Sequence, residues 1–168
     1  MGNGEAAGTV RVRRATVTDA TTVSALNADV QAVHAAALPW LFKTASTDTF
    51  PATTAAAVLA RDDVLVYLAY VEEEPAGYAY AQVRRHPETS FKYAFDEIYL
   101  HHVSVRPSLR RRGIGRALLA AVRQAAIDRN IKQLALDVWS FNADAQAFFR
   151  RHGFEAYNAA MWQRVSAD

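Results

Sequence analysis

The feature that most constrains the fold is a strand pattern that changes into a helix pattern across an arginine–glycine turn. The run "DEIYLHHVSV" at 96–105 is rich in apolar and β-branched residues and predicts a strand. The run "RRRGIGRALL" at 110–119 follows it. Apolar residues at helical spacing then predict a helix over about 113–129, namely Ile114, Leu118, Val122 and Ala125. This order indicates a sheet with helices packed on it.

The remaining sequence predicts further strands and helices. Further strand patterns lie at 9–17, 64–71, 78–84 and 134–139, with one or two final strands within 154–165. Helices are predicted from Thr18 or Asp19 to Leu38, over about 51–60, and over 142–153. We therefore expect an α/β (mixed α+β) fold, in which a mixed central sheet of six or seven strands is flanked by about four helices.

Length and composition favour one domain. The chain has 168 residues, of which 51% are hydrophobic, and this is enough for a single core. We expect 1–8 to be a disordered leader and 9–168 to form the domain. The absence of cysteine excludes disulfides, thiolate metal sites and a cysteine nucleophile, and we expect no metal.

The positive charge of the chain is local. The formal net charge is only +2, which argues against a nucleic-acid partner or a membrane surface. Five arginines nevertheless fall between residues 106 and 116, a concentration that suits a small anionic ligand. Neither a signal peptide nor an apolar run of about 20 residues is visible, so we expect a cytoplasmic protein without a membrane partner.

The arginine–glycine turn has the chemistry of an anion site. Glycine near a helix start lowers stability by roughly 0.5–1 kcal/mol relative to alanine. The chain has two such glycines here, Gly113 and Gly115. A helix N-terminus presents unpaired amides that bind phosphate. At roughly 1.5–3 kcal/mol for each charge-assisted hydrogen bond, a few amides and an arginine approach the ~8 kcal/mol of micromolar binding. A pyrophosphate fits this description, and the alternative is an ordinary turn with solvated arginines.

Two common pyrophosphate motifs do not match. A Walker motif needs Gly-Lys followed by Ser or Thr, and none follows the turn. A dinucleotide fingerprint needs a third glycine where the chain has Leu118, although Asp137 lies at a suitable distance downstream at the end of a predicted strand. Dinucleotide binding is therefore disfavoured.

The run "VSVRPSLRRRGIGRALL" resembles the acyl-CoA signature of the GNAT superfamily of N-acyltransferases, Arg/Gln-x-x-Gly-x-Gly/Ala. In this chain the signature spans Arg110 to Gly115. The run "LDVWSFNADAQAFFRRHGF" at 136–154 resembles the family's fifth strand and fourth helix, and the order of elements matches from about residue 9 to 165. The resemblance implies a sheet splayed between strands four and five, and acetyl-CoA as co-substrate.

The resemblance also implies roles for individual residues. The pyrophosphate would lie on the signature and on the residue after it, namely Arg110, Arg111, Arg112, Gly113, Ile114, Gly115 and Arg116. The pantetheine arm would bond the main chain of Val103 and Val105, and the amide of Val103 or Ser104 would polarise the thioester carbonyl. Asn142 would touch the cofactor, or it would simply cap the helix that follows it.

The implied reaction is direct attack of a primary amine on the thioester, which needs a general base. The strand position at which the family often has a glutamate carries Tyr99. Glu97 and His101 share a face with Tyr99 by the two-residue period of a strand, and we nominate one of these two as the base. Alternatively, both are merely polar residues at the edge of a strand. His34 and His102 are assigned structural roles.

One position departs from the family pattern. Phe149 stands where members often carry a tyrosine that protonates the departing thiolate. Tyr99 and Tyr157 are candidates to replace it, and a thiol with a pKa near 8.5 leaves tolerably without help. The alternative function is a non-catalytic domain that binds or senses acyl-CoA. The expected partner is a small-molecule or peptide amine, and a homodimer is left open.

Overall fold

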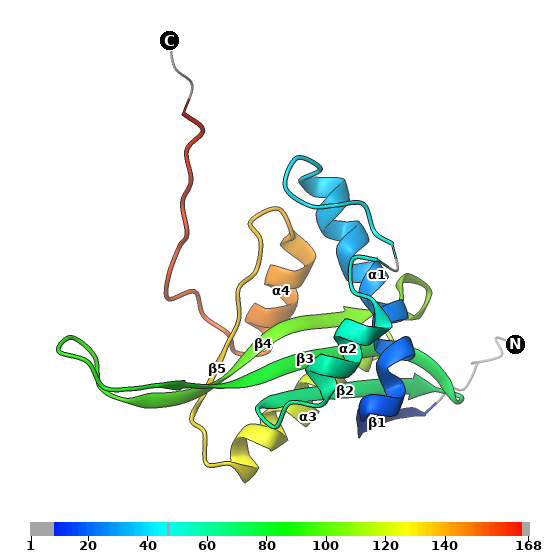
Figure 1. The fold of residues 1–168 in the computed structure, drawn as a ribbon, viewed down its shortest axis with the longest axis horizontal. Helices are drawn as coiled ribbons and strands as arrows, with labels where there is room; N and C mark the ends of the chain where they lie inside the picture. Colours follow the sequence, from blue (N-terminus) through cyan, green and yellow to red (C-terminus); the bar gives the residue numbers. More distant parts are fainter. Residues whose placement is uncertain (1–8, 47, 166–168) are drawn as a thin grey trace, which may run out of the picture. The chain divides into compact units, whose positions relative to one another are not determined.

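In the computed structural model, the described residues are 9–46 and 48–165. The chain forms two compact units, of which the first ends at Asp137 and the second begins at Val138. The first unit contains all five strands and three of the four α-helices, and the second contains the fourth helix (Figure 1).

The sheet has five strands in the order β1-β2-β3-β4-β5. Neighbours from β1 to β4 are antiparallel, and β5 runs parallel to β4. The predicted mixed sheet is therefore confirmed. The strands are β1 (Val10–Arg14), β2 (Val64–Val71), β3 (Glu74–His86), β4 (Phe95–Val105) and β5 (Gln133–Ala135).

The prediction of six or seven strands was wrong. Within the described chain, residues 154–165 form no strand, and Tyr157, Met161 and Trp162 are largely exposed there. Alternating apolar residues favour extended backbone, but a strand also needs a hydrogen-bonding partner edge. The described part of the second unit contains no other strand to supply one.

The four α-helices are close to their predicted ranges. They are α1 (Ala20–Ala37), α2 (Ala52–Leu59), α3 (Ile114–Asp128) and α4 (Ala143–Arg151). Short 3₁₀ turns, η1 (Val17–Asp19) and η2 (Pro107–Leu109), precede α1 and α3. In the ranges that the structure describes, no helix combines the length and the apolar character needed to cross a bilayer.

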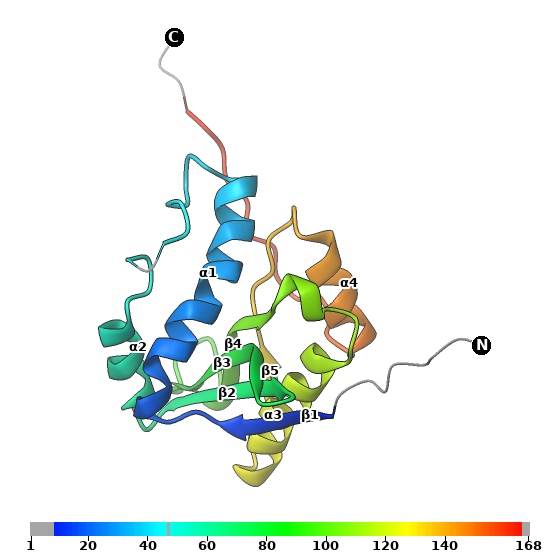
Figure 2. The same cartoon turned by 90° about the vertical axis from the view of Figure 1, so that its right-hand side faces the viewer.

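Helices cover both faces of the sheet in the first unit. Figure 2 shows α1 and α2 on one side and α3 on the other. The core under α1 and α2 consists of Val23 and Leu26 packed with strand residues Val64, Val66, Leu68 and Tyr78. The buried face of α3 contributes Ile114, Leu118, Leu119 and Val122. Because side chains alternate along a strand, each face of β3 and β4 meets a different helix layer.

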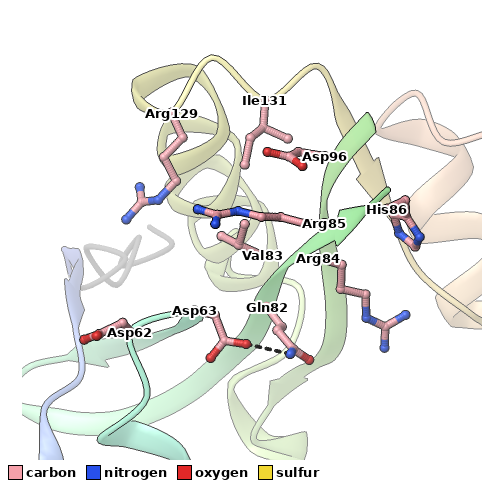
Figure 3. Close-up of a pocket in the computed structure, with 10 residues that line it drawn as sticks. All are labelled: Asp62, Asp63, Gln82, Val83, Arg84, Arg85, His86, Asp96, Arg129 and Ile131. Carbon is pink, nitrogen blue, oxygen red and sulfur yellow. Dashed lines mark hydrogen bonds between the residues drawn. The ribbon is translucent and has the colours of Figure 1, made fainter. Parts of the chain in front are cut away.

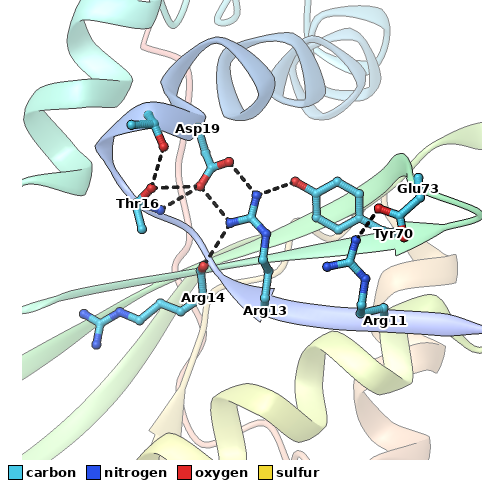
Figure 4. A network of polar contacts seen from close by, with 8 residues as sticks. Arg11, Arg13, Arg14, Thr16, Asp19, Tyr70 and Glu73 are labelled. Carbon is cyan, nitrogen blue, oxygen red and sulfur yellow. Dashed lines mark hydrogen bonds and ion pairs between the residues drawn. The ribbon is translucent and has the colours of Figure 1, made fainter.

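A polar network fixes the start of α1 against the edge of the sheet (Figure 4). Asp19 accepts two hydrogen bonds from the Arg13 guanidinium, at 2.7 and 2.8 Å, and one from the amide of Thr16. Arg13 also donates to the Tyr70 hydroxyl at 2.7 Å. The Arg13 hydrogen bonds are the main reason that the pKa of Asp19 falls to about 2. This network links β1, β2 and the helix that covers them.

Candidate active site

The turn between β4 and α3 exposes a row of main-chain amides. Arg111 and Gly113 both adopt left-handed backbone conformations, with φ of 65° and 80°. The first helical hydrogen bond runs from the Ala117 amide to the Gly113 carbonyl at 3.0 Å. Within the described residues, the amides of 111–116 donate to no acceptor. These amides lie at the positive end of α3, in the turn where the sequence analysis predicts that an anion binds.

Gly113 leaves open space above the turn. Apart from its chain neighbours, no described residue would come within 4 Å of a Cβ placed on Gly113, so the space on this side of its Cα is open. Ile114 beside it is fully buried and anchors the turn on the sheet. The side chains of Arg110, Arg111, Arg112 and Arg116 are exposed and form no ion pair with the described residues. The turn therefore combines free donors with uncompensated positive charge.

The strand that leads to this turn has one unpaired edge. β4 pairs with β5 only from Glu97 to Tyr99, the last pair being Tyr99 with Ala135. From Leu100 to Val105, β4 has no strand neighbour on that side among the described residues of the first unit. Val103, Ser104 and Val105 lie in this stretch. This is where the sequence analysis expects strands four and five to separate.

A β-bulge alters the expected alternation of side chains along β4. Tyr80 pairs with His102 and Ala81 pairs with Leu100, so His101 is an extra residue in the strand. His101 stacks on Tyr80, with ring centroids 4.5 Å apart, and His102 lies edge-on to the same ring at 5.6 Å. The bulge therefore turns two successive histidines toward the face that α1 covers.

His101 is held by a chain of hydrogen bonds that fixes its tautomer. Gln82 donates through Nε2 to Asp63 Oδ2 at 2.8 Å, which directs Gln82 Oε1 toward His101 Nε2 at 3.1 Å. Asp63 is in turn paired with Arg61 at 2.7 Å. Because Gln82 Oε1 can only accept, neutral His101 carries its proton on Nε2 and keeps a lone pair on Nδ1. Burial, with Arg84 and Arg61 nearby, lowers the pKa of His101.

Glu97, the other nominated base, lies in different surroundings. Its carboxylate is buried and accepts a hydrogen bond from His86 Nε2 at 3.0 Å. It stands in the part of β4 that is paired on both sides, opposite Arg84 and Gln133. The structure thus brings His101 together with the unpaired edge and leaves Glu97 further along the strand.

Tyr99 and Asp137 form a contact that the sequence analysis did not assign to this site. The Tyr99 hydroxyl donates to Asp137 Oδ2 at 2.6 Å. The Arg84 guanidinium lies 3.5 Å from the centroid of the Tyr99 ring, and the His101 ring lies edge-on to it at 4.9 Å. Burial, and then the neighbouring Asp137, raise the pKa of Tyr99 to about 12, so the phenol keeps its proton. The signal in the sequence was an aspartate at the end of a predicted strand.

A second missed group is buried between α1 and the sheet. Asn27 Nδ2 donates to the Tyr78 hydroxyl, which lies 2.8 Å from His102 Nδ1. Burial raises the pKa of Tyr78 and lowers that of His102 to about 4. His102 is therefore neutral at physiological pH, which agrees with its structural assignment. Asn27 among the apolar residues of α1 was the available signal.

An open cavity of about 840 Å³ lies beside Gln82 and Asp63, whose hydrogen bond Figure 3 shows. Arg129 lines it from beyond the C-terminal end of α3, the opposite end from the amide turn. Its lining is mostly charged and comprises Asp62, Asp63, Gln82, Val83, Arg84, Arg85, His86, Asp96, Arg129 and Ile131. None of residues 110–116 in the amide turn lines this cavity. Among the described residues, no cluster of three or more histidine, aspartate or glutamate side chains could hold a metal.

In the second unit, Asn142 is a helix cap. Its Oδ1 accepts the amide hydrogen of Ala145 at 3.1 Å at the start of α4. Phe149 packs edge-on against Phe154, with centroids 5.4 Å apart, and offers no proton to a leaving group. Tyr157, a nominated replacement acid, is largely exposed.

The profile of the acetyltransferase (GNAT) family matches residues 29–154, which is most of the chain and includes β4, the amide turn and α4. The chain belongs to the GNAT family of acetyltransferases. The resemblance of the arginine–glycine signature is thereby confirmed. Family membership is shown by this match in sequence.

Two curated relatives match over part of their length. A Bacillus subtilis protein described as uncharacterised, YxbD, is 36% identical over 62 residues, which are 37% of this chain and 39% of that protein. The chain thus aligns with well under half the length of that relative. An aminoglycoside N(6')-acetyltransferase type 1 of Salmonella typhimurium is 25% identical over 107 residues, which are 64% of this chain and 73% of the enzyme.

Solved structures share the whole GNAT fold. A mutant of the BH1408 protein of Bacillus halodurans superposes with a TM-score of 0.88 at 22% identity, over 93% of this chain and 99% of that one. The aminoglycoside N-acetyltransferase AAC(6')-Iy, in complex with the bisubstrate analogue CoA-S-monomethyl-acetylneamine, gives 0.71 at 21% identity, over 95% and 99% of the chains. At these identities the likeness concerns the fold alone.

Proposed function

We propose that this GNAT protein transfers an acetyl group from acetyl-CoA to a primary amine by direct attack of the amine on the thioester. The observation that carries the proposal is the row of free amides at 111–116 with open space above Gly113. The complex of AAC(6')-Iy with a CoA-containing analogue supports the choice of cofactor.

The cofactor would bind along β4 and the turn. The diphosphate would accept hydrogen bonds from the amides of 111–116, with Arg110, Arg111, Arg112 and Arg116 available for its charge and for a further phosphate. The pantetheine arm would lie against the unpaired edge of β4 and bond the main chain of Val103 and Val105. Asn142 as a cofactor ligand stays a prediction.

The base in this proposal is His101. An alkyl amine with a pKa near 10.4 is almost wholly protonated at neutral pH, so one proton must be removed before attack. The free lone pair on His101 Nδ1 suits this task, and its lowered pKa keeps the ring uncharged. The main-chain amide of Val103 or Ser104 would stabilise the negative charge that develops on the carbonyl oxygen. Glu97 is the less suitable choice because His86 occupies its carboxylate.

The acceptor in this proposal is a small-molecule amine. Two matched proteins are named as aminoglycoside N-acetyltransferases, so aminoglycosides are the first class to test. A peptide amine is the second. Transfer would proceed without a tyrosine at position 149, at reduced speed, because the coenzyme A thiol can leave as thiolate.

Phe149 also favours a second function, a domain that binds acyl-CoA without catalysis. The two functions separate in one experiment on the full chain. Calorimetry with coenzyme A should give micromolar binding under either function, and absence of binding would reject both. Thiol release from acetyl-CoA is then followed with aminoglycosides, polyamines, amino acids and peptides. One acceptor that releases thiol supports the enzyme, and none across the panel supports the sensor.

A further inference from the structure

We propose that Asp137 is the carboxylate that binds the ammonium group of the acceptor, and that Tyr99 holds this carboxylate in position. The inference rests on the proposed acetyl transfer and adds to it the acceptor subsite and the charge that the subsite selects. Neither residue was assigned this role from the sequence, where Asp137 was considered only as part of a dinucleotide motif.

The position of Asp137 places its carboxylate at the opening of the sheet. Tyr99 pairs with Ala135 at the last contact between β4 and β5, and Asp137 follows two residues later. By the two-residue period, Asp137 therefore shares a face with Tyr99. Their hydrogen bond of 2.6 Å confirms this arrangement. From Leu100 to Val105, the unpaired edge of β4 spans six residues, or about 20 Å of strand.

The carboxylate of Asp137 is available to a ligand. The residue is exposed, Tyr99 occupies Oδ2, and Oδ1 accepts no hydrogen bond from the described residues. Asp137 forms no ion pair within the described chain. The nearby Arg84 lies over the Tyr99 ring and is likewise free of carboxylate partners in that part of the chain. An ammonium group would supply the missing donor and the missing charge at Oδ1.

Tyr99 acts on the acceptor through Asp137. Its ring is fixed between the Arg84 guanidinium, 3.5 Å from the ring centroid, and the edge-on ring of His101. Its phenol retains the proton and so remains a donor to the carboxylate. With the ring and the hydrogen bond both fixed, one oxygen of Asp137 faces away from Tyr99. This makes Tyr99 a positioning residue.

The contact of His101 with Tyr99 connects this subsite to the proposed base. The ammonium group bound at Asp137 would give one proton to His101 Nδ1, and the neutral nitrogen would then attack the thioester carbonyl carbon. The N–C bond forms, and the C–S bond breaks with its electron pair left on sulfur. The nitrogen then loses its second proton, and of the two protons released one ends on the thiolate and one in solvent. Asp137 takes no part in these proton transfers.

The subsite predicts a preference for cationic acceptors. Benzylamine carries a positive charge at neutral pH, whereas aniline has a similar ring and no charge. Loss of the Asp137 charge should therefore weaken the use of benzylamine and leave the use of aniline nearly unchanged. A purely structural role of Asp137 would lower both to the same extent.

The test uses the full chain with Asp137→Asn, Asp137→Glu and Tyr99→Phe, and with Asp128→Asn at the end of α3 as a matched exposed aspartate. The affinity for neamine, a cationic aminoglycoside, is measured by calorimetry with coenzyme A present. We expect at least tenfold weaker binding for Asp137→Asn, partial recovery for Asp137→Glu, and no change for Asp128→Asn. Tyr99→Phe should raise KM three- to tenfold with kcat within twofold.

The outcomes separate the subsite from the reaction. Asp137→Asn protein that binds neamine within twofold of wild type, or that loses benzylamine and aniline transfer equally, would overturn the inference. Wild-type protein that binds neither neamine nor benzylamine would overturn it as well. If wild type binds amines through Asp137 but releases no thiol from acetyl-CoA, the inference stands and the proposed enzymatic function fails.

Discussion

The two faces of the central sheet differ in what they bury. Toward α3 the interface is apolar, with buried side chains from both layers: Leu65, Ala69, Ala79, Ala81, Ile98, Leu100, Ile114, Leu118, Leu119 and Val122. Toward α1 and α2, an apolar core covers β2, whereas β3 and β4 present tyrosines, histidines and their hydrogen-bond partners. β4 contributes to both faces, through Ile98 and Leu100 on one side and Tyr99 and His101 on the other.

The difference shows how one strand can serve packing and chemistry together. Apolar burial stabilises by about 25 cal/mol per Å² and needs no directional partner. A buried polar group destabilises the fold unless it is hydrogen-bonded. Among the described residues, no buried side-chain nitrogen or oxygen lacks a hydrogen-bond partner. The polar face is therefore organised by specific contacts, and changes on the two faces should affect different measurements.

The largest expected effect on stability comes from the apolar face. Leu118 is fully buried in α3, and Leu118→Ala leaves a cavity against the sheet. The free energy of unfolding should fall by about 3 kcal/mol, as measured by urea unfolding. The kcat/KM of the protein that remains folded should stay within twofold of wild type, since no proposed ligand contact involves Leu118. A selective loss of kcat/KM at full folding would show that the two faces are not separate in function.

A substitution in the turn at the end of β4 should change the affinity for coenzyme A but not the stability of the fold. Gly113→Asp places a negative charge where we expect the diphosphate, and coenzyme A affinity should fall at least 100-fold, about 2.7 kcal/mol. Asp and Asn both tolerate the left-handed conformation of Gly113, and apart from its chain neighbours no described residue would lie within 4 Å of their Cβ. Gly113→Asn is therefore the matched neutral control, with an expected loss below tenfold. Calorimetry gives the affinities, and thermal melting checks the fold. Equal losses for the two variants would refute the electrostatic account.

The parts of the site that are local in sequence could be predicted from it. The turn follows from the glycines, the arginines and the apolar period after them, all within about 20 residues. The order of strands and helices also follows from local patterns. The family signature is itself such a local pattern, which is why the match over 29–154 agrees with the resemblance.

The parts that depend on register could not be predicted. The two-residue period placed Glu97, Tyr99 and His101 on one face, but it could not show the bulge that turns His102 the same way. Register is set between strands, and the sequence of β4 alone does not contain it. Likewise, the alternation in 154–165 predicted strands, whereas strand formation also requires a free partner edge.

The contact between Asp137 and Tyr99 could not be predicted from the sequence for a related reason. Tyr99 and Asp137 are 38 residues apart, and they meet only because β4 and β5 pair in parallel at Tyr99 and Ala135. A side chain that acts through a tertiary contact gives no periodic signal in the sequence. The residues of the proposed acceptor subsite could therefore be identified only from the three-dimensional structure.

The smallest expected effect concerns the polar face of the sheet, and it is a change in how the free energy of unfolding depends on pH. The pKa of His102 is lowered from 6.5 to about 4, mainly by burial and then by His101 and His34. Between these two values the unfolded chain binds a proton that the folded protein does not. Stability from neutral His102 is thus present above about pH 6.5 and is lost as pH falls toward 4, by about 2 kcal/mol at pH 5.

His102→Gln should remove this dependence while keeping an acceptor for the Tyr78 hydroxyl, which lies 2.8 Å from His102 Nδ1. At pH 8 both proteins are uncharged at this position, so their free energies of unfolding should differ by only about 1 kcal/mol, the value of one altered hydrogen bond. As pH falls from 6.5 to 5, wild type should lose stability faster than the variant in urea unfolding. Parallel curves over this interval would mean that His102 is protonated in the folded protein. The polar face would then contain a charged histidine without an acidic partner. This would contradict the conclusion that specific hydrogen bonds organise that face.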